Sequence, residues 1–390
     1  MKPSQQQQWP KWNQVDWPTT LFLTITPVVG LIGTGVAIGV EGFSWGMALF
    51  SLIFAALTNL SITAGYHRLF SHRSYDAHPV ARWILVFIGT SAWQSSALKW
   101  CTDHRKHHAE VDTDEDPYSI NRGFWYAHLG WMFFKPAEDF KIHCPDLEKD
   151  PLLRFQHNHY IKCAIAVGFL LPWLIGWMVG YPLTGLFMAG ALRIGLTQQS
   201  TFFVNSLCHT FGKRTYSDQI TARDSLFVAV LTHGEGYHNF HHKFQIDYRN
   251  GIRWWQWDPT KWTIETMKYL GLASKLRTVS PTEILKARLH MESITLTSRG
   301  YSQEKLEALK AKVLHAQVRM KKLKEDYAHL KVEYRRLKAD YAKKTAEWQE
   351  HSRESIERMK TEITLAKLEF RYSLKQWKAL VKSPVPVAIS

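Results

Sequence analysis

The sequence contains little cysteine, and none of it is arranged as a metal or disulfide motif. Its four cysteines are Cys101, Cys144, Cys163 and Cys208, in a chain of 390 residues. No two of them form a CxxC pair, so the pattern favours neither a disulfide framework nor a thiolate metal site. This scarcity fits a protein whose polar parts face a reducing compartment.

The chain also lacks a recognisable secretory leader. The stretch Gln5–Gln8 before the first apolar run is uncharged, and that run is longer than the core of a typical signal peptide. We therefore expect the first apolar segment to remain as a membrane anchor.

Long apolar runs, by contrast, are abundant. Four come close to the roughly 20 residues that cross a bilayer as a helix. The short connection between the first and second runs, and the one between the third and fourth, contain no Lys or Arg. Residues 66–162 and those after Leu207 are, by contrast, rich in both. The positive-inside rule then predicts that both large polar segments, with any site that they form, and both termini face the cytoplasm. The four runs lie at about Trp17–Val40, Trp45–Gly65, Cys163–Gly180 and Leu183–Leu207.

A shorter apolar stretch, Trp83–Trp93, is too short to span. We interpret it as an amphipathic or buried helix against the cytoplasmic face, since a fifth span would place the histidine clusters described below on opposite sides of the membrane. The sequence thus predicts an all-α, multi-pass integral membrane protein with four transmembrane helices and a cytoplasmic domain.

The formal net charge of +15 is concentrated near the C-terminus. Residues 301–382 hold 21 Lys and Arg against 12 Asp and Glu, which is a net +9. Beside membrane spans, a basic segment indicates attraction to anionic membrane lipids rather than to nucleic acid.

The same segment carries a heptad repeat, which is typical of a coiled coil or a folded-back helical hairpin. A solvated single helix on the headgroups is the alternative. The register slips after Trp348, where we expect a hinge. We predict a tail at 1–16, a membrane domain at 17–275, a linker at 276–300, a basic coiled coil at 301–382 able to form a homo-oligomer, and a tail at 383–390. The repeat runs through Leu306, Val313, Met320, Tyr327, Tyr334, Tyr341 and Trp348.

Histidine is abundant, with 19 residues, and eight of them fall in three clusters. Two clusters have the pattern HxxHH, which puts all three side chains on one helix face where their ring nitrogens can converge on a metal. The remaining pair is five residues apart, so a helix should end or bulge between its members. The clusters are His67 and His72; His104, His107 and His108; and His238, His241 and His242.

A ninth candidate, His209, follows the last apolar run, one turn after Asn205. Gln198 and Thr201 lie earlier in that run, and polar residues at membrane depth usually face a bundle interior. Eight or nine histidines exceed the ligand number of one ion, so two metals are implied. Imidazole binds Fe, Zn, Cu and Ni alike, so the ligands alone leave the metal open.

Acidic residues near the clusters are candidates for holding the histidine rings in place by hydrogen bonds. A carboxylate-bridged metal site and a capped turn before Pro117 are the alternatives for the stretch after the second cluster. Six other histidines, outside the clusters and before the C-terminal segment, are expected to be ordinary. The acidic candidates are Asp103, Asp112, Asp114, Glu115, Asp116, Asp224 and Glu235; the six histidines are His78, His128, His143, His157, His159 and His233.

These motifs resemble, in order and spacing, those of the membrane fatty acyl desaturases of the stearoyl-CoA desaturase type. The resemblance covers roughly residues 15–275 and rests on His67–His72, Asp103–His108, Asn205–His209 and Gly234–His242. It implies that the nine histidines bind two iron ions, with Asn205 holding a metal-bound water. It also implies O2-dependent removal of two hydrogens from an acyl chain, leaving a cis double bond, commonly at Δ9.

An acyl substrate has no polar groups near its reacting carbons. Only the shape of an apolar tunnel can therefore set which carbons lie beside the metals. The resemblance places a bend of this tunnel near Trp100 and Thr201, with Gln198 close by, and its closed end near Ala55 and Asn59. Lys135 keeps a charge that acyl-CoA members use, but Thr102 and Pro136 replace other basic residues. The carrier is therefore open among CoA, acyl carrier protein and an acyl lipid.

No heme-binding motif is fused to either end, so we expect electrons from a separate ferredoxin or cytochrome b5 type donor. Within enzymes, the alternative is a membrane di-iron hydroxylase or alkane monooxygenase. Outside enzymes, it is a metal-binding membrane scaffold.

Overall fold

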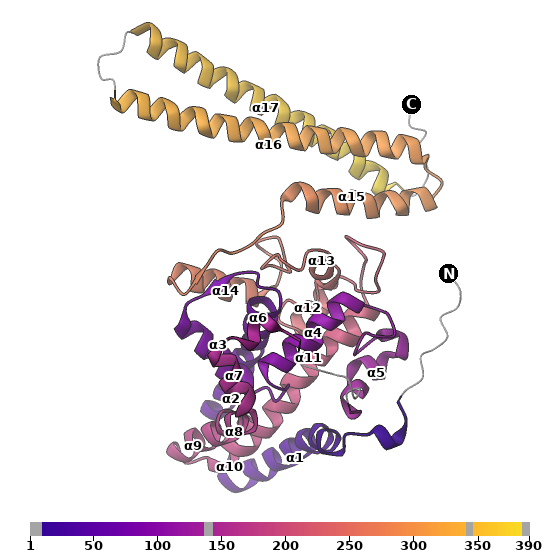
Figure 1. Cartoon of the computed structure of the whole chain (residues 1–390), viewed down its shortest axis with the longest axis vertical. Coiled ribbons are helices and arrows are strands. Elements are labelled where there is room, and N and C mark those ends of the chain that lie inside the picture. The colour runs from indigo at the N-terminus through magenta and orange to yellow at the C-terminus, as the bar shows by residue number, and fades with distance from the viewer. Residues whose placement is uncertain (1–9, 136–142, 341–345, 384–390) are drawn as a thin grey trace. The chain divides into compact units, whose positions relative to one another are not determined.

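The computed structural model describes residues 10–135, 143–340 and 346–383, and the protein is mostly helical (Figure 1). It divides into two compact units, residues 1–279 and 280–390. Most of the two predicted tails lies outside the described residues, as does Pro136.

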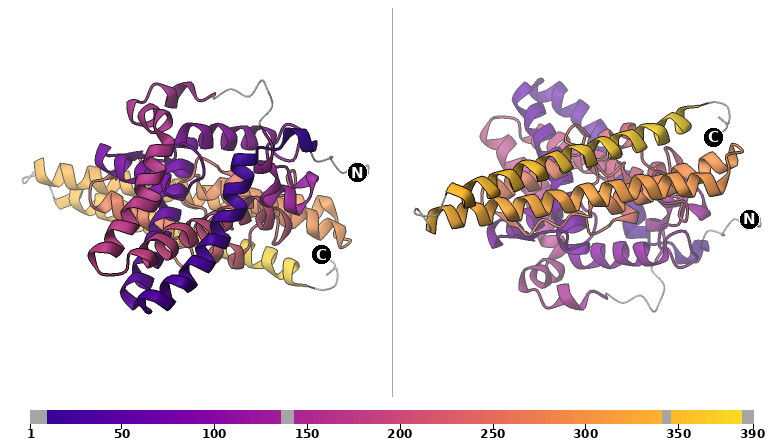
Figure 2. Two further views of the ribbon diagram at one scale, coloured as in Figure 1. Left: turned by 90° about the horizontal axis from the view of Figure 1, so that it is seen from below. Right: turned by 90° about the horizontal axis from the view of Figure 1, so that it is seen from above.

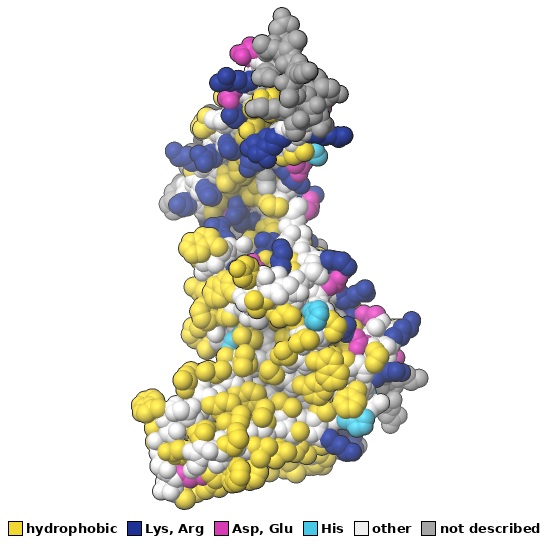
Figure 3. All heavy atoms as spheres, turned by 90° about the vertical axis from the view of Figure 1, so that its left-hand side faces the viewer, with side chains coloured by type: hydrophobic (Ala, Val, Ile, Leu, Met, Phe, Trp, Pro, Cys, Tyr) yellow, Lys and Arg dark blue, Asp and Glu magenta, His cyan; other side chains and the backbone are white. Residues whose placement is uncertain are grey.

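Three helical stretches of the first unit are long and apolar enough to cross a membrane. Figure 3 shows the matching surface, where apolar side chains cover the lower part of the view. Bundle-facing residues apart, their side chains are largely exposed, as expected for a surface that contacts lipid. The stretches are α1 (Trp17–Glu41); α2 (Trp45–Leu60) with the π-helix η2 (Ser61–Ser71); and α8 (Tyr160–Ile165), the π-helix η5 (Ala166–Leu170) and α9 (Leu171–Met178).

The fourth apolar run is also helical without a break. It comprises α10 (Pro182–Thr184), the π-helix η6 (Gly185–Leu192) and α11 (Arg193–Thr210). Arg193 and the glutamines lower its hydropathy below that of the other three stretches. Its role as a fourth span therefore stays a prediction.

Arg193 is fully buried among these helices and meets oxygen atoms on every side. Its Nε donates to Ala189 O at 2.7 Å, and its two Nη atoms donate to Thr58 Oγ1 at 3.1 Å and Ser91 O at 3.1 Å. The guanidinium also lies over the ring of Phe54, 4.3 Å from its centroid. A buried cation is tolerated at such a position only when it is paired in this way.

Small residues allow the helices to approach closely. A Cβ added at Gly30 would lie 2.4 Å from Leu192 N in η6, and one at Gly176 would lie 2.4 Å from Tyr181 O. Close approach through glycine is the usual packing mode of helices in lipid, where no hydrophobic effect drives their association. Glu41, at the end of α1, adds a polar contact by accepting from Leu183 N at 2.7 Å and Thr184 N at 2.9 Å.

Helices rich in polar residues complete the first unit. The stretch Trp83–Trp93 was predicted to contain a non-spanning helix, and α3 (Pro79–Thr90) confirms the helix. A core of buried apolar residues fills the space between η2, α3, α4 (Ala97–Glu110), α7 (Pro151–Asn158) and α14 (Pro259–Tyr269). The remaining elements are η1 (Trp12–Gln14), η3 (Ile120–Arg122), α5 (Phe124–His128), η4 (Gly130–Phe133), α6 (Pro145–Glu148), α12 (Leu226–Leu231), α13 (His238–Lys243) and the antiparallel strands β1 (Asp76–Ala77) and β2 (Ala273–Ser274).

The second unit is built from α15 (Pro281–Ser298), α16 (Gln303–Asp340) and α17 (Ala346–Lys382). Helices α16 and α17 lie side by side and antiparallel in Figures 1 and 2. The folded-back hairpin is thus the arrangement within one chain, and a coiled coil between chains stays a prediction. Residues predicted as a linker instead contain α15, because Leu289 and Leu296 bury their side chains against the hairpin core.

Candidate metal centre

Four separate segments bring the nine candidate histidines together. His67 lies in η2 and His72 directly after it, while three more histidines project from α4. His209 lies in the last turn of α11, and the last three lie on the short helix α13. Their ligand nitrogens form two groups, each with all atoms within 4.8 Å of one another. One group is His67, His72, His104, His108 and His241; the other is His107, His209, His238 and His242.

The predicted bulge between the first two histidines is confirmed. Residues 61–71 form a π-helix, and the His72 N–H donates to His67 O, five residues back, at 3.1 Å. A π-helix has wider turns than an α-helix, so residues five apart share a face. The five-residue spacing therefore lets both rings turn toward the same point.

The first group is tightly packed around its inner nitrogens. The Nε2 atoms of His67 and His241 are 3.0 Å apart, those of His241 and His108 are 3.0 Å apart, and those of His72 and His104 are 2.8 Å apart. In the second group, the Nε2 atoms of His242 and His238 are 3.0 Å apart. Within each group, the imidazole nitrogens therefore converge on one point.

The sequence suggested that the three histidines of each HxxHH cluster converge on one metal. In the structure, each cluster is instead divided between the two groups. His104 and His108, four residues apart on α4, join the first group, but His107 between them joins the second. On α13 the roles are exchanged, because the outer pair joins the second group and His241 joins the first. Each helix therefore lies between the two groups and contributes to both.

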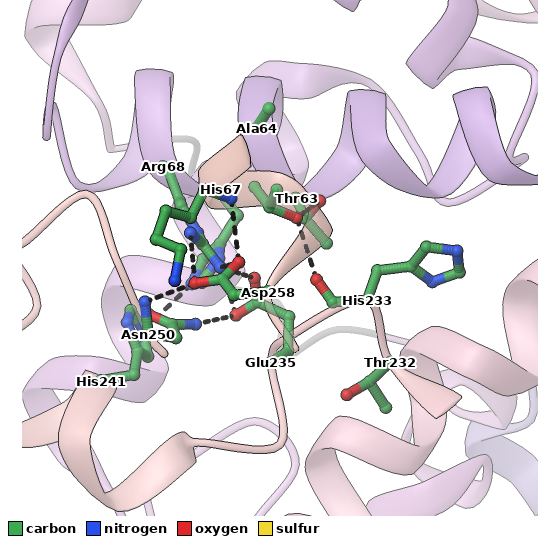
Figure 4. Close-up of polar contacts among 12 residues, drawn as sticks. Thr63, Ala64, His67, Arg68, Thr232, His233, Glu235, His241, Asn250 and Asp258 are labelled. Carbon is green, nitrogen blue, oxygen red and sulfur yellow. Dashed lines mark hydrogen bonds and ion pairs between the residues drawn. The ribbon is translucent and has the colours of Figure 1, made fainter. Parts of the chain in front are cut away.

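The first group is anchored by a buried network of charged side chains (Figure 4). Glu235 Oε2 lies 3.2 Å from His67 Nδ1, and Arg68 Nη2 donates to Glu235 Oε1 at 3.0 Å. Arg68 also donates to both carboxylate oxygens of Asp258, at 3.2 and 3.0 Å. Burial would raise the pKa of Glu235, but the neighbouring His67 and Arg68 outweigh it and lower that pKa to about 2. Glu235 is thus an anion held beside the outer nitrogen of His67.

Carboxylates also support the second group. His107 Nδ1 lies 2.9 Å from Asp116 Oδ1. His209 Nδ1 lies 2.7 Å from Thr221 Oγ1, whose hydroxyl donates to Asp112 Oδ1 at 2.6 Å. The proposed ring-holding role therefore fits Glu235, Asp116 and Asp112.

The other acidic candidates have different partners. Asp103 pairs with Lys99, one turn away on α4, and Glu115 pairs with Lys106. Asp224 accepts from the Phe240 backbone at 3.0 Å, which holds the start of α13 rather than a ring. Among the histidines predicted to be ordinary, His128 contacts Ser206 and Gln199, away from both groups.

The protonation state of these histidines suits metal binding. Burial lowers the pKa of His104, His108, His238, His241 and His242 well below the usual range, and the neighbouring histidines lower it further. Neutral imidazole is the metal-binding form.

The direction of the ring hydrogens also fits a metal. Where the outer Nδ1 faces an acceptor, as in His107 and His209, it carries the hydrogen, so the inner Nε2 presents a lone pair. The Nε2 of His209 is buried without a hydrogen-bond partner among the described residues. Lone pairs converging in a buried space repel one another unless a cation lies between them, so the residues fit two metal ions.

The predicted tunnel residues lie in the first unit. The Trp100 ring stacks on His104 at 4.8 Å, and Thr201 Oγ1 accepts from Gln94 Nε2 at 2.9 Å. Gln198 is buried and donates to Trp93 O at 3.1 Å. The structure leaves the tunnel itself a prediction. Asn59 is buried, Ala55 and Asn205 are partly buried, and Lys135 is exposed.

Sequence reasoning missed Arg68, Asp258 and Arg193. A signal existed for the two arginines, since each is a lone cation within or at the end of an apolar run. Their partners could not be inferred, because Asp258 is 190 residues from Arg68.

The first unit thus combines helices long and apolar enough to cross a membrane with two adjoining groups of histidines that could each hold a metal ion. Residues 43–272 match the family described as "Fatty acid desaturase", and the chain belongs to this family.

Its relatives include Acyl-CoA desaturase 1 of Saccharomyces cerevisiae, which is 39% identical over 77% of this chain and 58% of the relative. The sn-1 stearoyl-lipid 9-desaturase of Anabaena variabilis is 38% identical over 68% of this chain and 94% of the relative. Stearoyl-CoA desaturase 5 of Bos taurus is 38% identical over 60% of this chain and 72% of the relative. The chain thus spans less than two thirds of the length of the yeast relative.

Proposed function

We propose that the protein is an O2-dependent fatty acyl desaturase that inserts a cis double bond, at Δ9, into a long saturated acyl chain. The observation that carries this proposal is the pair of buried groups, one of five histidines and one of four, in a chain of the desaturase family. Iron bound at both groups would activate O2, the oxidant, for breaking unactivated C–H bonds, which side chains cannot do.

The chain's own residues have three roles in this proposal. The nine histidines hold the metals, with Asn205 positioning a water molecule at the second group. Glu235, Asp116 and Asp112 fix the ring orientations. Trp100, Thr201 and Gln198 shape the bend of a substrate tunnel that ends near Ala55 and Asn59, and Lys135 contacts the carrier of the acyl chain.

The carrier of the acyl chain and the electron donor are also part of this proposal. Relatives are named both as acyl-CoA and as stearoyl-lipid desaturases, so either substrate form suits this chain, and an acyl carrier protein is the third candidate. Electrons would come from a separate ferredoxin or cytochrome b5 type protein.

We also propose a four-span topology with the metal centre and both termini in the cytoplasm. The fourth span would be residues 183–207, and the pairing of Arg193 with hydroxyl and carbonyl oxygens offsets much of the cost of placing a cation there. Labelling of single introduced cysteines from either side of sealed vesicles tests the orientation.

The deciding experiment is expression in a host that lacks unsaturated fatty acids, followed by mass spectrometry of its lipids. Cis-monounsaturated chains with the double bond at carbon 9 would support the proposal. Hydroxylated chains would instead support the hydroxylase alternative. A protein that holds two metals but neither consumes O2 nor changes the lipids would support a scaffold.

A further inference from the structure

The C-terminal half of α17 carries an exposed apolar stripe. Leu365, Leu368 and Tyr372 are 60%, 54% and 65% exposed, although they lie in a helix that is packed along its other side. Their spacing of three and four residues places them on one face. Ile363, Ala366 and Trp377 bury their side chains on the opposite face, toward the hairpin core. The stripe is therefore no part of that core.

A row of basic side chains runs beside this stripe. Residues 363–382 contain five basic residues and one acidic residue, Glu369, which pairs with Arg319 of α16 at 3.2 Å. Steps of four, four, three and four residues place the five cations on one face, next to the apolar one. All five are exposed, and none forms an ion pair with another described residue. They are Lys367, Arg371, Lys375, Lys378 and Lys382.

We propose that this face of α17 binds the headgroup region of an anionic lipid bilayer. An apolar stripe flanked by Lys and Arg is the arrangement of helices that lie in a membrane interface. Each basic residue near an anionic surface strengthens binding about fivefold. Covalent attachment to a unit with membrane-spanning helices keeps the hairpin near a bilayer, so weak intrinsic affinity is enough. Figure 3 shows the dark-blue basic side chains of the second unit.

A second copy of the chain is a poorer occupant. Pairing this face with itself would bring the cation rows of two chains together, and such like-charge contacts oppose association. Three apolar side chains also offer little area to offset that repulsion. The charge pattern therefore favours a lipid surface, a proposal that is independent of the enzymatic activity.

The test places an environment-sensitive fluorophore on the full-length protein. Leu368→Cys is labelled in a Cys163→Ala background, because the other three native cysteines are buried. Glu362→Cys is the matched control, since it is exposed on the same helix about 120° from Leu368. Both proteins are reconstituted into vesicles of phosphatidylcholine with or without phosphatidylglycerol.

We expect the label at position 368 to shift to the blue, and to be quenched by spin-labelled lipid, only when phosphatidylglycerol is present. High salt or the pair Lys367→Glu and Lys375→Glu should reverse the shift, while the label at position 362 stays in water. A water-exposed label at 368 in both vesicle types would overturn the proposal. A shift that follows protein density rather than lipid charge would also overturn it, in favour of a second copy. Neither readout needs turnover.

Discussion

The buried carboxylate of Glu235 faces hydrogen-bond donors on both oxygens. Oε1 accepts from Arg68 Nη2 at 3.0 Å, while Oε2 accepts from Asn250 Nδ2 at 2.7 Å and lies 3.2 Å from His67 Nδ1. The substitution Glu235→Gln replaces one of these oxygens by an NH2 group. Whichever way the amide turns, it then points a donor at a donor. Both His67 and Arg68 lose their anionic neighbour, and either Arg68 or the pair His67 and Asn250 also loses its acceptor.

The size of the effect follows from these contacts. Loss of a hydrogen-bond partner behind a metal-binding histidine typically costs 10–100-fold in metal affinity, which is about 1.4–2.8 kcal/mol. The fold should lose about 1–3 kcal/mol, since at least one buried donor is left unsatisfied. A larger loss is not expected, because Arg68 keeps both contacts to Asp258.

The assay is metal affinity measured by chelator competition, together with Mössbauer spectra of the 57Fe-loaded protein. Asp116→Asn is the matched variant, since Asp116 contacts His107 of the other group at 2.9 Å. We expect each variant to weaken one iron and leave the other signal unchanged, with a different iron affected in each. The reasoning is refuted if Glu235→Gln binds two irons with unaltered affinity, or if both variants weaken the same iron.

Four further changes probe other parts of the molecule. His242→Ala should leave at most one firmly bound iron and no desaturation, while His315→Ala on exposed α16 should match the wild type; an active His242→Ala protein would exclude the assignment. A chain ending at Val279 should still desaturate, because each unit has its own core; a folded, iron-loaded truncation without turnover would contradict this. Ala55→Trp should shift preference to shorter chains by about 1–3 kcal/mol, without moving the double bond relative to the carboxyl end; lipid analysis showing a moved double bond would disprove this tunnel placement. Gly176→Leu should lower the melting temperature in detergent, since even a Cβ would lie 2.4 Å from a carbonyl oxygen, and unchanged melting would show that the hairpin can open there.

Local spacing was enough to identify the main features of this protein from its sequence. Apolar runs of bilayer length, histidines three and four residues apart on a helix, and the five-residue interval before His72 all concern neighbours along the chain. Their consequences, namely helices and a π-type bulge, are local as well. The order and spacing of the histidine motifs also identified the family, because such motifs are independent of how the segments finally pack.

Only the tertiary structure decided how the nine histidines divide. His107 and His241 each cross to the group opposite their sequence neighbours, because α4 and α13 both lie between the two groups. Spacing on one helix cannot reveal what lies on either side of it. The same holds for Arg68 with Asp258, and for Arg193 with Ser91, whose contacts join distant segments. Burial makes these pairs necessary, since an isolated buried charge is costly, but only the packing of the helices selects the partner.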